Sequence, residues 1–306
     1  MSEPAPPPSS NEGRRPQDLD PAALARQQRR LAGAEPPWLH AEVARRMAER
    51  LPFIKLQPRR VLDATPVLGA SQELLREAYP QAELLWHEAS GPLLVRAQRE
   101  LAPGWWQRLL GGGAARVEQL PAQPAVDLLW SNLALHACPD LPAQLAAWQA
   151  SLAVDGFVMF SCLGPDSFVE LRPLWAEAGW GRPAPDWWDM HDLGDLLVQA
   201  GFADPVMDQE RLRLTWSEPE KLLADLRALG GNLAPTRFAG LRGRGWRQEL
   251  LRRLERLRDD QGRLVLTLEL VSGHALKAAP RLTVAAETRV SVDSLRSALK
   301  SGRRGG

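Results

Sequence analysis

Acidic and polar residues stand at the ends of three short apolar segments, where they could bind a ribose-containing ligand. The candidates are Asp63, Glu88, Ser131, Asn132 and Leu133. A carboxylate at the end of a strand, such as that of Glu88, can accept hydrogen bonds from both hydroxyls of a ribose. Asp63 would hold the turn after its own strand, and the backbone of residues 131–133 would lie along the ligand.

Each candidate also has a purely structural interpretation. Taken alone, Glu88 is better explained as a solvated residue at a strand end. Asp63 could cap the helix that follows it, with nearly the same contacts. Residues 131–133 could form a plain turn. The residue types therefore indicate a site only if the fold brings the three segments together.

Two histidines could do further chemistry. His136 is a candidate acid–base group, although a polar residue at the start of a helix is the more economical interpretation. His191, with Asp192 and Asp195 nearby, could suggest a metal site. Carboxylates at a helix N-terminus, where they complement the helix dipole, explain this group better, so we expect no metal.

Apolar periodicity predicts a scaffold that would bring the candidates together. Strands are predicted at 60–64, 83–87, 116–118, 125–130, 157–160, 206–216 and 264–271. Helices are predicted at 39–51, 71–79, 93–97, 141–152, 193–200, 219–229 and 246–257. Alternating strands and helices with short connections favour a doubly wound, mostly parallel α/β sheet, which binds ligands at the carboxyl ends of its strands.

Composition gives no sign of nucleic acid or membrane partners. The 306 residues contain 38 Lys and Arg against 37 Asp and Glu, a net charge of +1. Two cysteines without metal-ligand spacing, and no apolar run long enough for a membrane span, favour a reduced cytoplasmic compartment. We expect a disordered leader at 1–17, one domain at 18–279 with N-terminal helices and a cap at about 219–260, and a tail at 280–306. Oligomeric state is not predicted.

Several motifs together resemble a known family. They are "VLDA…LGAS" (61–71), "WHEAS" (86–90), "DLLWSNLALHACPDLPAQLAAW" (127–148), the stretch 155–175, "MHDLGDLLVQAGFADPVMD" (190–208) and "GRLVLTLELVSGHALK" (262–277). They are similar to class I S-adenosylmethionine-dependent methyltransferases, and most similar to the malonyl-acyl-carrier-protein O-methyltransferases of early biotin synthesis. The resemblance covers residues 36–278 and is most specific over 127–175.

The resemblance implies a seven-stranded Rossmann-like sheet with helical cap insertions. It also implies methyl transfer from S-adenosylmethionine to the free carboxylate of a malonyl thioester on acyl-carrier protein. Asp63, Gly69, Glu88 and residues 131–133 would bind the cofactor. Because the carboxylate is already ionised at pH 7, the reaction needs no base. Arg172 is a candidate for positioning that carboxylate.

Some positions depart from the family pattern. The family places glycines at 65, 67 and 69, whereas this chain has Thr65, Pro66 and Val67 and keeps only Gly69. Arg116 replaces an acidic residue near the adenine, and 37–39 replace a substrate-side tyrosine. These departures leave two alternatives open: a non-catalytic paralogue that lost the cofactor but kept the carrier-protein surface, and a methyltransferase for another small acceptor.

A basic stretch follows the predicted helix at 219–229. Its loop arginines are Arg237, Arg242, Arg244 and Arg247, for which the sequence offers no nearby acidic partners. Carrier proteins present an acidic helix, so these arginines could form a docking surface. A merely solvated loop explains them equally well.

Overall fold

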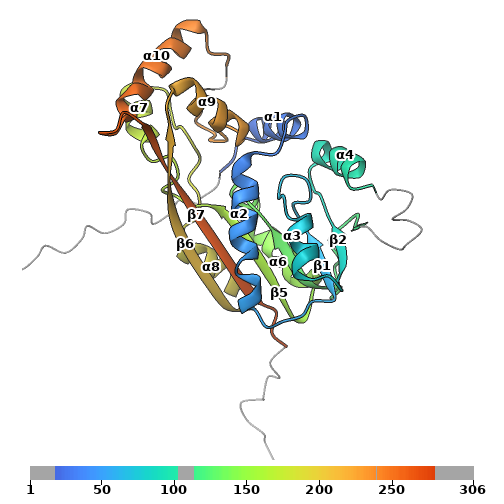
Figure 1. Cartoon of the computed structure of the whole chain (residues 1–306). Helices are drawn as coiled ribbons and strands as arrows, with labels where there is room; N and C mark the ends of the chain where they lie inside the picture. Colours follow the sequence, from blue (N-terminus) through green and yellow to red (C-terminus); the bar gives the residue numbers. More distant parts are fainter. Residues whose placement is uncertain (1–17, 103–113, 239, 280–306) are drawn as a thin grey trace, which may run out of the picture.

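A single sheet of seven strands organises the protein. The computed structural model describes residues 18–102, 114–238 and 240–279. The strands are β1 (Arg60–Asp63), β2 (Glu83–Trp86), β3 (Ala115–Arg116), β4 (Val126–Ser131), β5 (Leu152–Leu163), β6 (Ala203–Trp216) and β7 (Leu264–Leu276). Their order in the sheet is β3-β2-β1-β4-β5-β7-β6 (Figure 1).

The pairing of the strands is mostly parallel. β1 to β5 pair in parallel, while β7 runs antiparallel to both of its neighbours, β5 and β6. The order reverses direction beside β1, so the carboxyl ends of β1, β2 and β4 face one crevice. The predicted doubly wound, mostly parallel α/β sheet is confirmed.

Helices cover both faces of this sheet. They are α1 (Pro21–Ala32), α2 (Trp38–Ala48), α3 (Gln72–Ala78), α4 (Gly91–Glu100), α6 (Leu141–Ser151), α7 (Leu171–Glu177), α8 (Met190–Gln199), α9 (Pro219–Ala228) and α10 (Arg244–Leu254). Short 3₁₀ turns are η1 (Leu51–Phe53), η2 (Leu135–Ala137) and η3 (Glu255–Leu257).

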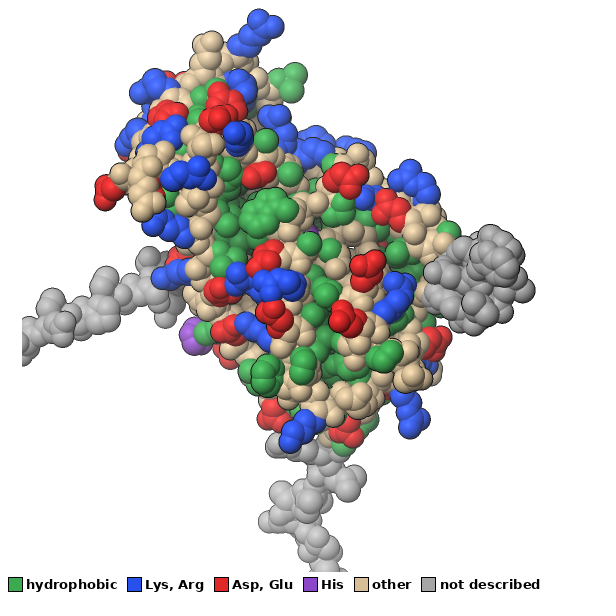
Figure 2. All heavy atoms as spheres, viewed as in Figure 1, with side chains coloured by type: hydrophobic (Ala, Val, Ile, Leu, Met, Phe, Trp, Pro, Cys, Tyr) green, Lys and Arg blue, Asp and Glu red, His purple; other side chains and the backbone are tan. Residues whose placement is uncertain are grey.

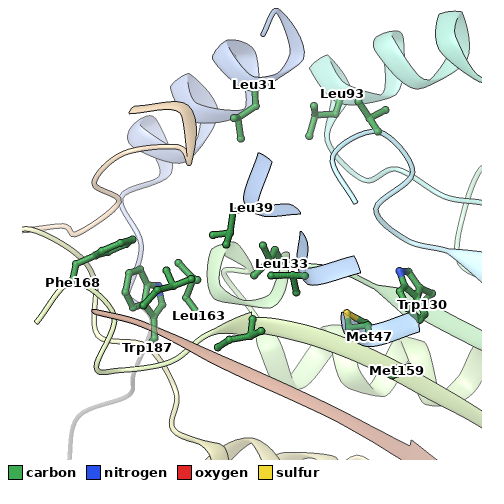
Figure 3. Packing of buried hydrophobic residues seen from close by; sticks show 14 of the residues in the cluster. Leu31, Leu39, Met47, Leu93, Trp130, Leu133, Met159, Leu163, Phe168 and Trp187 are labelled. Carbon is green, nitrogen blue, oxygen red and sulfur yellow. The ribbon is translucent and has the colours of Figure 1, made fainter. Parts of the chain in front are cut away.

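Neighbouring residues of a central strand face two different hydrophobic cores, as the pleat requires. In β4, Leu128 and Trp130 belong to the core under α2, α3 and α4, while Leu129 belongs to the core under α6 and α8. Figure 3 shows the first of these cores, where Met47 of α2 lies near Trp130. Burial of both strand faces explains why β4 reads as a continuous apolar run.

Helix α1 joins two parts of the molecule that are distant in sequence. Asp20 caps the helix by accepting hydrogen bonds from Ala22 N (2.8 Å) and Ala23 N (3.0 Å), and Pro21 fits the first helical position. The Asp20 N–H donates to the carbonyl of Leu233, beyond α9. At the other end, Arg96 of α4 donates to the carbonyl of Leu31 (3.0 Å). The helix therefore spans from the α9–α10 region to α4 (Figure 1).

Two segments differ from the sequence-based expectation. Of the expected N-terminal helices the apolar pattern gives bounds only to 39–51 and none to α1, and the predicted strand 157–160 is the middle of the much longer β5. Asp155 and Gly156 lie in a bulge within this strand, between the pairs Val126–Leu152 and Leu128–Phe157. Asp155 adopts a φ of 64°, which a short polar side chain tolerates well.

The helices at 219–229 and 246–257 are present as α9 and as α10 with η3. They stand at the far end of the long strands β6 and β7 and form, with α7, an upper lobe (Figure 1). The predicted leader 1–17 and tail 280–306 lie outside the described residues. Within the described part of the chain, no helix is long and apolar enough to cross a membrane.

Candidate functional site

The first cavity lies at the carboxyl ends of β1, β2 and β4 and has a volume of about 230 Å³. Four of the six predicted cofactor residues line it: Glu88, Ser131, Asn132 and Leu133. Asp63 and Gly69 do not line it, but both hold the loop between β1 and α3. The structure thus brings the three separate segments of the sequence to one crevice, where a doubly wound fold binds its ligands.

The loop after β1 is held by its own side chains. Asp63 Oδ1 accepts from the backbone N–H (2.8 Å) and the hydroxyl (3.3 Å) of Thr65, and Asp63 Oδ2 accepts from Gln72 Nε2 (2.9 Å). Burial raises the pKa of Asp63 to about 6, against the lowering effect of these hydrogen bonds. Asp63 therefore organises the loop from behind the cavity wall.

The residues that replace the glycines are accommodated without backbone strain. Neither Thr65 nor Val67 has a positive φ, and the left-handed residue of this loop is Ala70, with a φ of 52°. Gly69 has another role, because a Cβ there would overlap the carbonyl oxygen and hydroxyl of Thr65. The Thr65 side chain occupies the room that Gly69 leaves.

Asn132 is the centre of a buried hydrogen-bond network. Its side-chain nitrogen donates to the carbonyls of His40 (2.7 Å) and Gly69 (2.8 Å), and its Oδ1 accepts from the Ser161 hydroxyl (2.8 Å). Its backbone N–H donates to the Thr65 hydroxyl (3.0 Å). The side chain links α2, the loop and β5. Its polar atoms are already hydrogen-bonded within the protein, so Asn132 would meet a ligand mainly through its surface at the cavity wall.

Glu88 is, among the described residues, the one acidic side chain that lines the first cavity. Its Oε1 accepts from the Ser90 N–H (2.9 Å), and its other oxygen has no hydrogen-bond partner in the described part of the chain. Burial raises the pKa of Glu88 to about 7, and the nearby charge of Asp63 raises it further. A ligand that donates hydroxyl protons to this carboxylate would favour its ionised form.

His136 sits on η2 at the wall of the same cavity. Burial lowers the pKa of His136 to about 3, so the imidazole is neutral at pH 7. Its Nδ1 is buried without a hydrogen-bond partner among the described residues, and its ring meets that of Trp187 edge-on, with the ring centres 6.2 Å apart. The imidazole is therefore available to a ligand as a neutral group.

The second cavity, of about 420 Å³, lies between α1, the segment 163–187 and the lobe formed by α9 and α10. Its walls are apolar, and the rings of Phe168 and Trp187 pack there with their centres 6.3 Å apart (Figure 3). The indole N–H groups of Trp187 and Trp246 are buried without hydrogen-bond partners among the described residues. Within those same residues, no acidic side chain lines this cavity but four arginines do: Arg30, Arg227, Arg242 and Arg247.

The predicted docking arginines have different surroundings. Arg237 forms an ion pair with Asp20 at 2.5 Å, with both side chains largely buried, so the expectation that it lacks an acidic partner is wrong. The guanidinium of Arg242 lies over Phe238 (4.0 Å) and Trp246 (4.8 Å). No ion pair involves Arg244 or Arg247 within the described residues, and Arg247 also lines the second cavity.

Two other predicted positions lie away from both cavities. Arg172 is exposed and donates to the carbonyl of Pro165, and it lines neither cavity. Arg116 lies on β3, 3.9 Å from Glu118. Among the described residues, no group of three or more His, Cys, Asp or Glu is placed to hold a metal ion.

Comparison with known proteins supplies the family. No family model matches the chain. A malonyl-[acyl-carrier protein] O-methyltransferase from Gallionella capsiferriformans is 44% identical over 252 residues, which are 80% of this chain and 86% of that protein. One from Laribacter hongkongensis is 43% identical over 251 residues, with coverage of 79% and 84%. The chain belongs to the malonyl-[acyl-carrier protein] O-methyltransferase family.

Solved structures agree with the fold of this methyltransferase family. The YcgJ protein from Bacillus subtilis superposes with a TM-score of 0.52 at 10% identity, covering 76% of this chain and 98% of that one. A protein from Bacillus halodurans, itself only provisionally assigned as a methyltransferase, gives 0.50 at 13% identity, with coverage of 76% and 99%. The fold is that of the class I methyltransferases.

The family resemblance does not reveal the contribution of α1. Gln27 of this helix lines both cavities, and Arg30 lines the second. The signal for the helix is present in the sequence, since Asp20 and Pro21 form a cap followed by Leu24 and Leu31 at helical spacing. A glutamine on the buried face interrupts the apolar pattern, and this interruption conceals the helix.

Proposed function

We propose that this protein transfers a methyl group from S-adenosylmethionine to the free carboxylate of a malonyl group carried as a thioester on acyl-carrier protein. The observation that carries the proposal is the junction of two unlike cavities. The first lies at the strand ends and contains a carboxylate, and the second is apolar, basic and covered by the α9–α10 lobe. Family membership supports both assignments.

The residues of the first cavity suit the cofactor. The free oxygen of Glu88 would accept from the ribose hydroxyls, and the backbone of residues 131–133 would lie along the nucleoside. The loop after β1 would contact the cofactor through side chains rather than through glycines. Ala64, Thr65 and Leu68 line the first cavity, and Gly69 packs behind Thr65. S-adenosylmethionine, when bound, supplies a methyl group on a positively charged sulfur.

The second cavity suits the malonyl thioester of the carrier protein, which is a long chain with negative charge near its ends. Its apolar walls would cover the acyl chain, and the unpartnered indole N–H groups of Trp187 and Trp246 would donate to carbonyl groups. Arg30 and Arg227 repel each other, and burial together with the charge of Arg227 lowers the pKa of Arg30. An anionic ligand would relieve that repulsion.

Catalysis would come from position and from the exclusion of water. The substrate carboxylate is ionised at pH 7, so no residue needs to remove a proton. Where the two cavities meet, the shared residues are neutral, His136 among them, so the reacting groups would find no competing charge there. In such a site the negative carboxylate and the positive sulfur of the donor, whose charges cancel during the reaction, would be held close together. No solvent shell would then have to reorganise.

The carrier protein would dock on the α9–α10 lobe. In Figure 2, basic side chains gather on this lobe, at the upper left of the view. Arg244 and Arg247 have no ion-pair partner among the described residues, and Arg247 lines the second cavity rather than the first. Acidic carrier proteins complement such a surface. The carrier-protein substrate also supports a cytoplasmic location.

A methyl-transfer assay tests the proposal. The purified protein, labelled S-adenosylmethionine and malonyl-loaded carrier protein should give an ester on the malonyl group that mild base removes. Acetyl-loaded carrier protein, which lacks the carboxylate, is the matched control and should remain unlabelled. Equal labelling of both would indicate another acceptor, and absence of label from both would support the non-catalytic alternative.

A further inference from the structure

Three described residues line both cavities: Gln27 of α1, His136 of η2 and Leu229 after α9. Two of them are polar, and they stand where the ligands of the two cavities would meet. A role for these two residues rests on the proposed function, because it concerns the reacting end of the substrate in that same site.

Gln27 is an unusual residue to find on the buried face of a helix. It is 7% exposed, and the Oε1 of its amide is buried without a hydrogen-bond partner among the described residues. Buried polar groups are nearly always hydrogen-bonded, because leaving them without partners is costly. A buried amide whose oxygen has no partner, placed at the wall of a cavity, is suited to bind a ligand.

The position of this amide is fixed by the segment after α9. A Cβ at Gly230, whose φ is 125°, would overlap the Nε2 of Gln27. Arg30, about one helical turn further along α1, donates to the Gly230 carbonyl. Gly230 therefore allows α1 to approach closely, and this approach holds the Gln27 amide at the junction.

The second polar group at the junction is also neutral and also unpartnered. Nδ1 of His136 is buried without a partner among the described residues, and the ring is held edge-on by Trp187. The charged residues lie on either side of the junction, with Glu88 in the first cavity only and Arg30 and Arg227 in the second only.

We propose that the Gln27 amide, together with the His136 imidazole, binds the free carboxylate of the malonyl group and directs one of its oxygens toward the methyl donor. One oxygen would accept from the amide N–H, and the other would stay free to attack. No proton is transferred, and the two residues act only by binding and orientation.

The neutrality of both groups serves the reaction. A guanidinium would place a full positive charge beside the carboxylate and would stabilise the ionised substrate more than the transition state, in which that negative charge is being lost. An amide fixes the carboxylate with less loss of nucleophilicity. The arginines of the second cavity can then attract the negatively charged substrate from a distance. They do not bind the attacking oxygen itself, so they do not lower its nucleophilicity.

The test compares binding of malonyl-loaded and acetyl-loaded carrier protein in the presence of S-adenosylhomocysteine, so that the readout is independent of turnover. Wild-type protein should prefer the malonyl form. Gln27→Leu, which keeps the size and removes the amide, should reduce that preference about tenfold, and Gln27→Glu should reverse it through like charge. Gln209→Leu, the same change at an exposed position on β6, should leave the preference intact.

Further readouts separate the alternatives. Affinity for S-adenosylhomocysteine should stay within about twofold of wild type in Gln27→Leu, and thermal stability should be equal or higher, because an unpartnered polar group is removed. A malonyl preference unchanged in Gln27→Leu would overturn the inference while leaving the proposed function in place. Weakened binding of S-adenosylhomocysteine would instead make Gln27 a cofactor contact. Failure of the wild-type protein to methylate malonyl carrier protein would refute the proposed function itself.

Discussion

The two cavities have opposite electrostatics. Among the described residues, the first is lined by the partly buried carboxylate of Glu88, with that of Asp63 behind it, and by no Lys or Arg. In the same part of the chain, four arginines and no acidic residue line the second. This division suits a cationic donor on one side and an anionic acceptor on the other, with neutral groups between them. The protein would thereby keep the two charges apart until both ligands are bound.

The cavities also differ in how they are built. The first arises where neighbouring strands end, so its residues follow short local patterns. The second is assembled from α1, the 163–187 segment and the α9–α10 lobe, which lie far apart in sequence. Single substitutions can test this contrast, and their expected effects range from a large loss of stability to a modest change in association rate.

Replacing Asn132 should have the largest effect, on stability rather than on ligand contact. Asn132→Ala removes the bonds of this side chain to the carbonyls of His40 and Gly69 and to the Ser161 hydroxyl. The Gly69 carbonyl keeps the Ser71 hydroxyl, and the Ser161 hydroxyl keeps the Leu133 N–H. We expect the free energy of unfolding to fall by about 2–4 kcal/mol, because buried groups lose their hydrogen bonds. Denaturant unfolding measures this change. A loss below about 1 kcal/mol would mean that water replaces the side chain.

Glu88→Gln should weaken binding of S-adenosylhomocysteine by about tenfold or more, since bonds to a charged acceptor become bonds to a neutral amide. Binding of malonyl carrier protein should hardly change, because Glu88 does not line the second cavity. Calorimetric titration of each ligand separates the two effects. Equal weakening of both ligands would contradict the division between the cavities.

The pH dependence of ligand binding should follow the same carboxylate. Because the pKa of Glu88 is raised to about 7, a ligand that needs its ionised form should bind more tightly as pH rises from about 6 to about 8. The stability of the unliganded protein should change in the opposite direction. The raised pKa of Glu88, and that of Asp63 at about 6, mean that their contribution is greatest at low pH and is lost as pH rises.

Glu88→Gln provides the control for this prediction. The variant should bind S-adenosylhomocysteine with little dependence on pH in this range, and titrations at several pH values would show it. A wild-type affinity that is flat between about pH 6 and pH 8 would mean that the carboxylate does not contact the ligand.

The smallest effect is expected on the lobe surface. Arg244→Glu should weaken binding of carrier protein a few-fold, mainly through slower association and more strongly at low salt. Arg237→Glu should instead lower stability, because it breaks the ion pair with Asp20 and leaves two like charges together. Binding kinetics and thermal melts distinguish the two. If both variants behave alike, the lobe has no dedicated docking residues.

Those parts of the molecule that depend on local pattern could be predicted from the sequence. β1, β2 and β4 are short apolar runs, and Glu88 and Asn132 follow soon after them, so the first cavity could be predicted. The ion pair of Arg237 could not, because Asp20 lies far away in the chain. Gln27 escapes prediction for a related reason, since a buried glutamine looks like a surface residue until the fold shows what covers it.

The loop after β1 shows another limit of sequence reasoning. The loss of glycines at 65 and 67 suggests a damaged site, yet the Thr65 hydroxyl accepts the Asn132 N–H and Gly69 accommodates the Thr65 side chain. The compensation is visible only in three dimensions. The loop is therefore rebuilt rather than lost.

The proposed function depends on whether the rebuilt loop leaves room for the cofactor, and calorimetric titration with S-adenosylhomocysteine tests this most directly. We expect binding in the micromolar range, with one ligand per chain. Absence of heat at millimolar ligand would contradict that expectation. The first cavity would then be a remnant of the methyltransferase fold, and the non-catalytic alternative would stand.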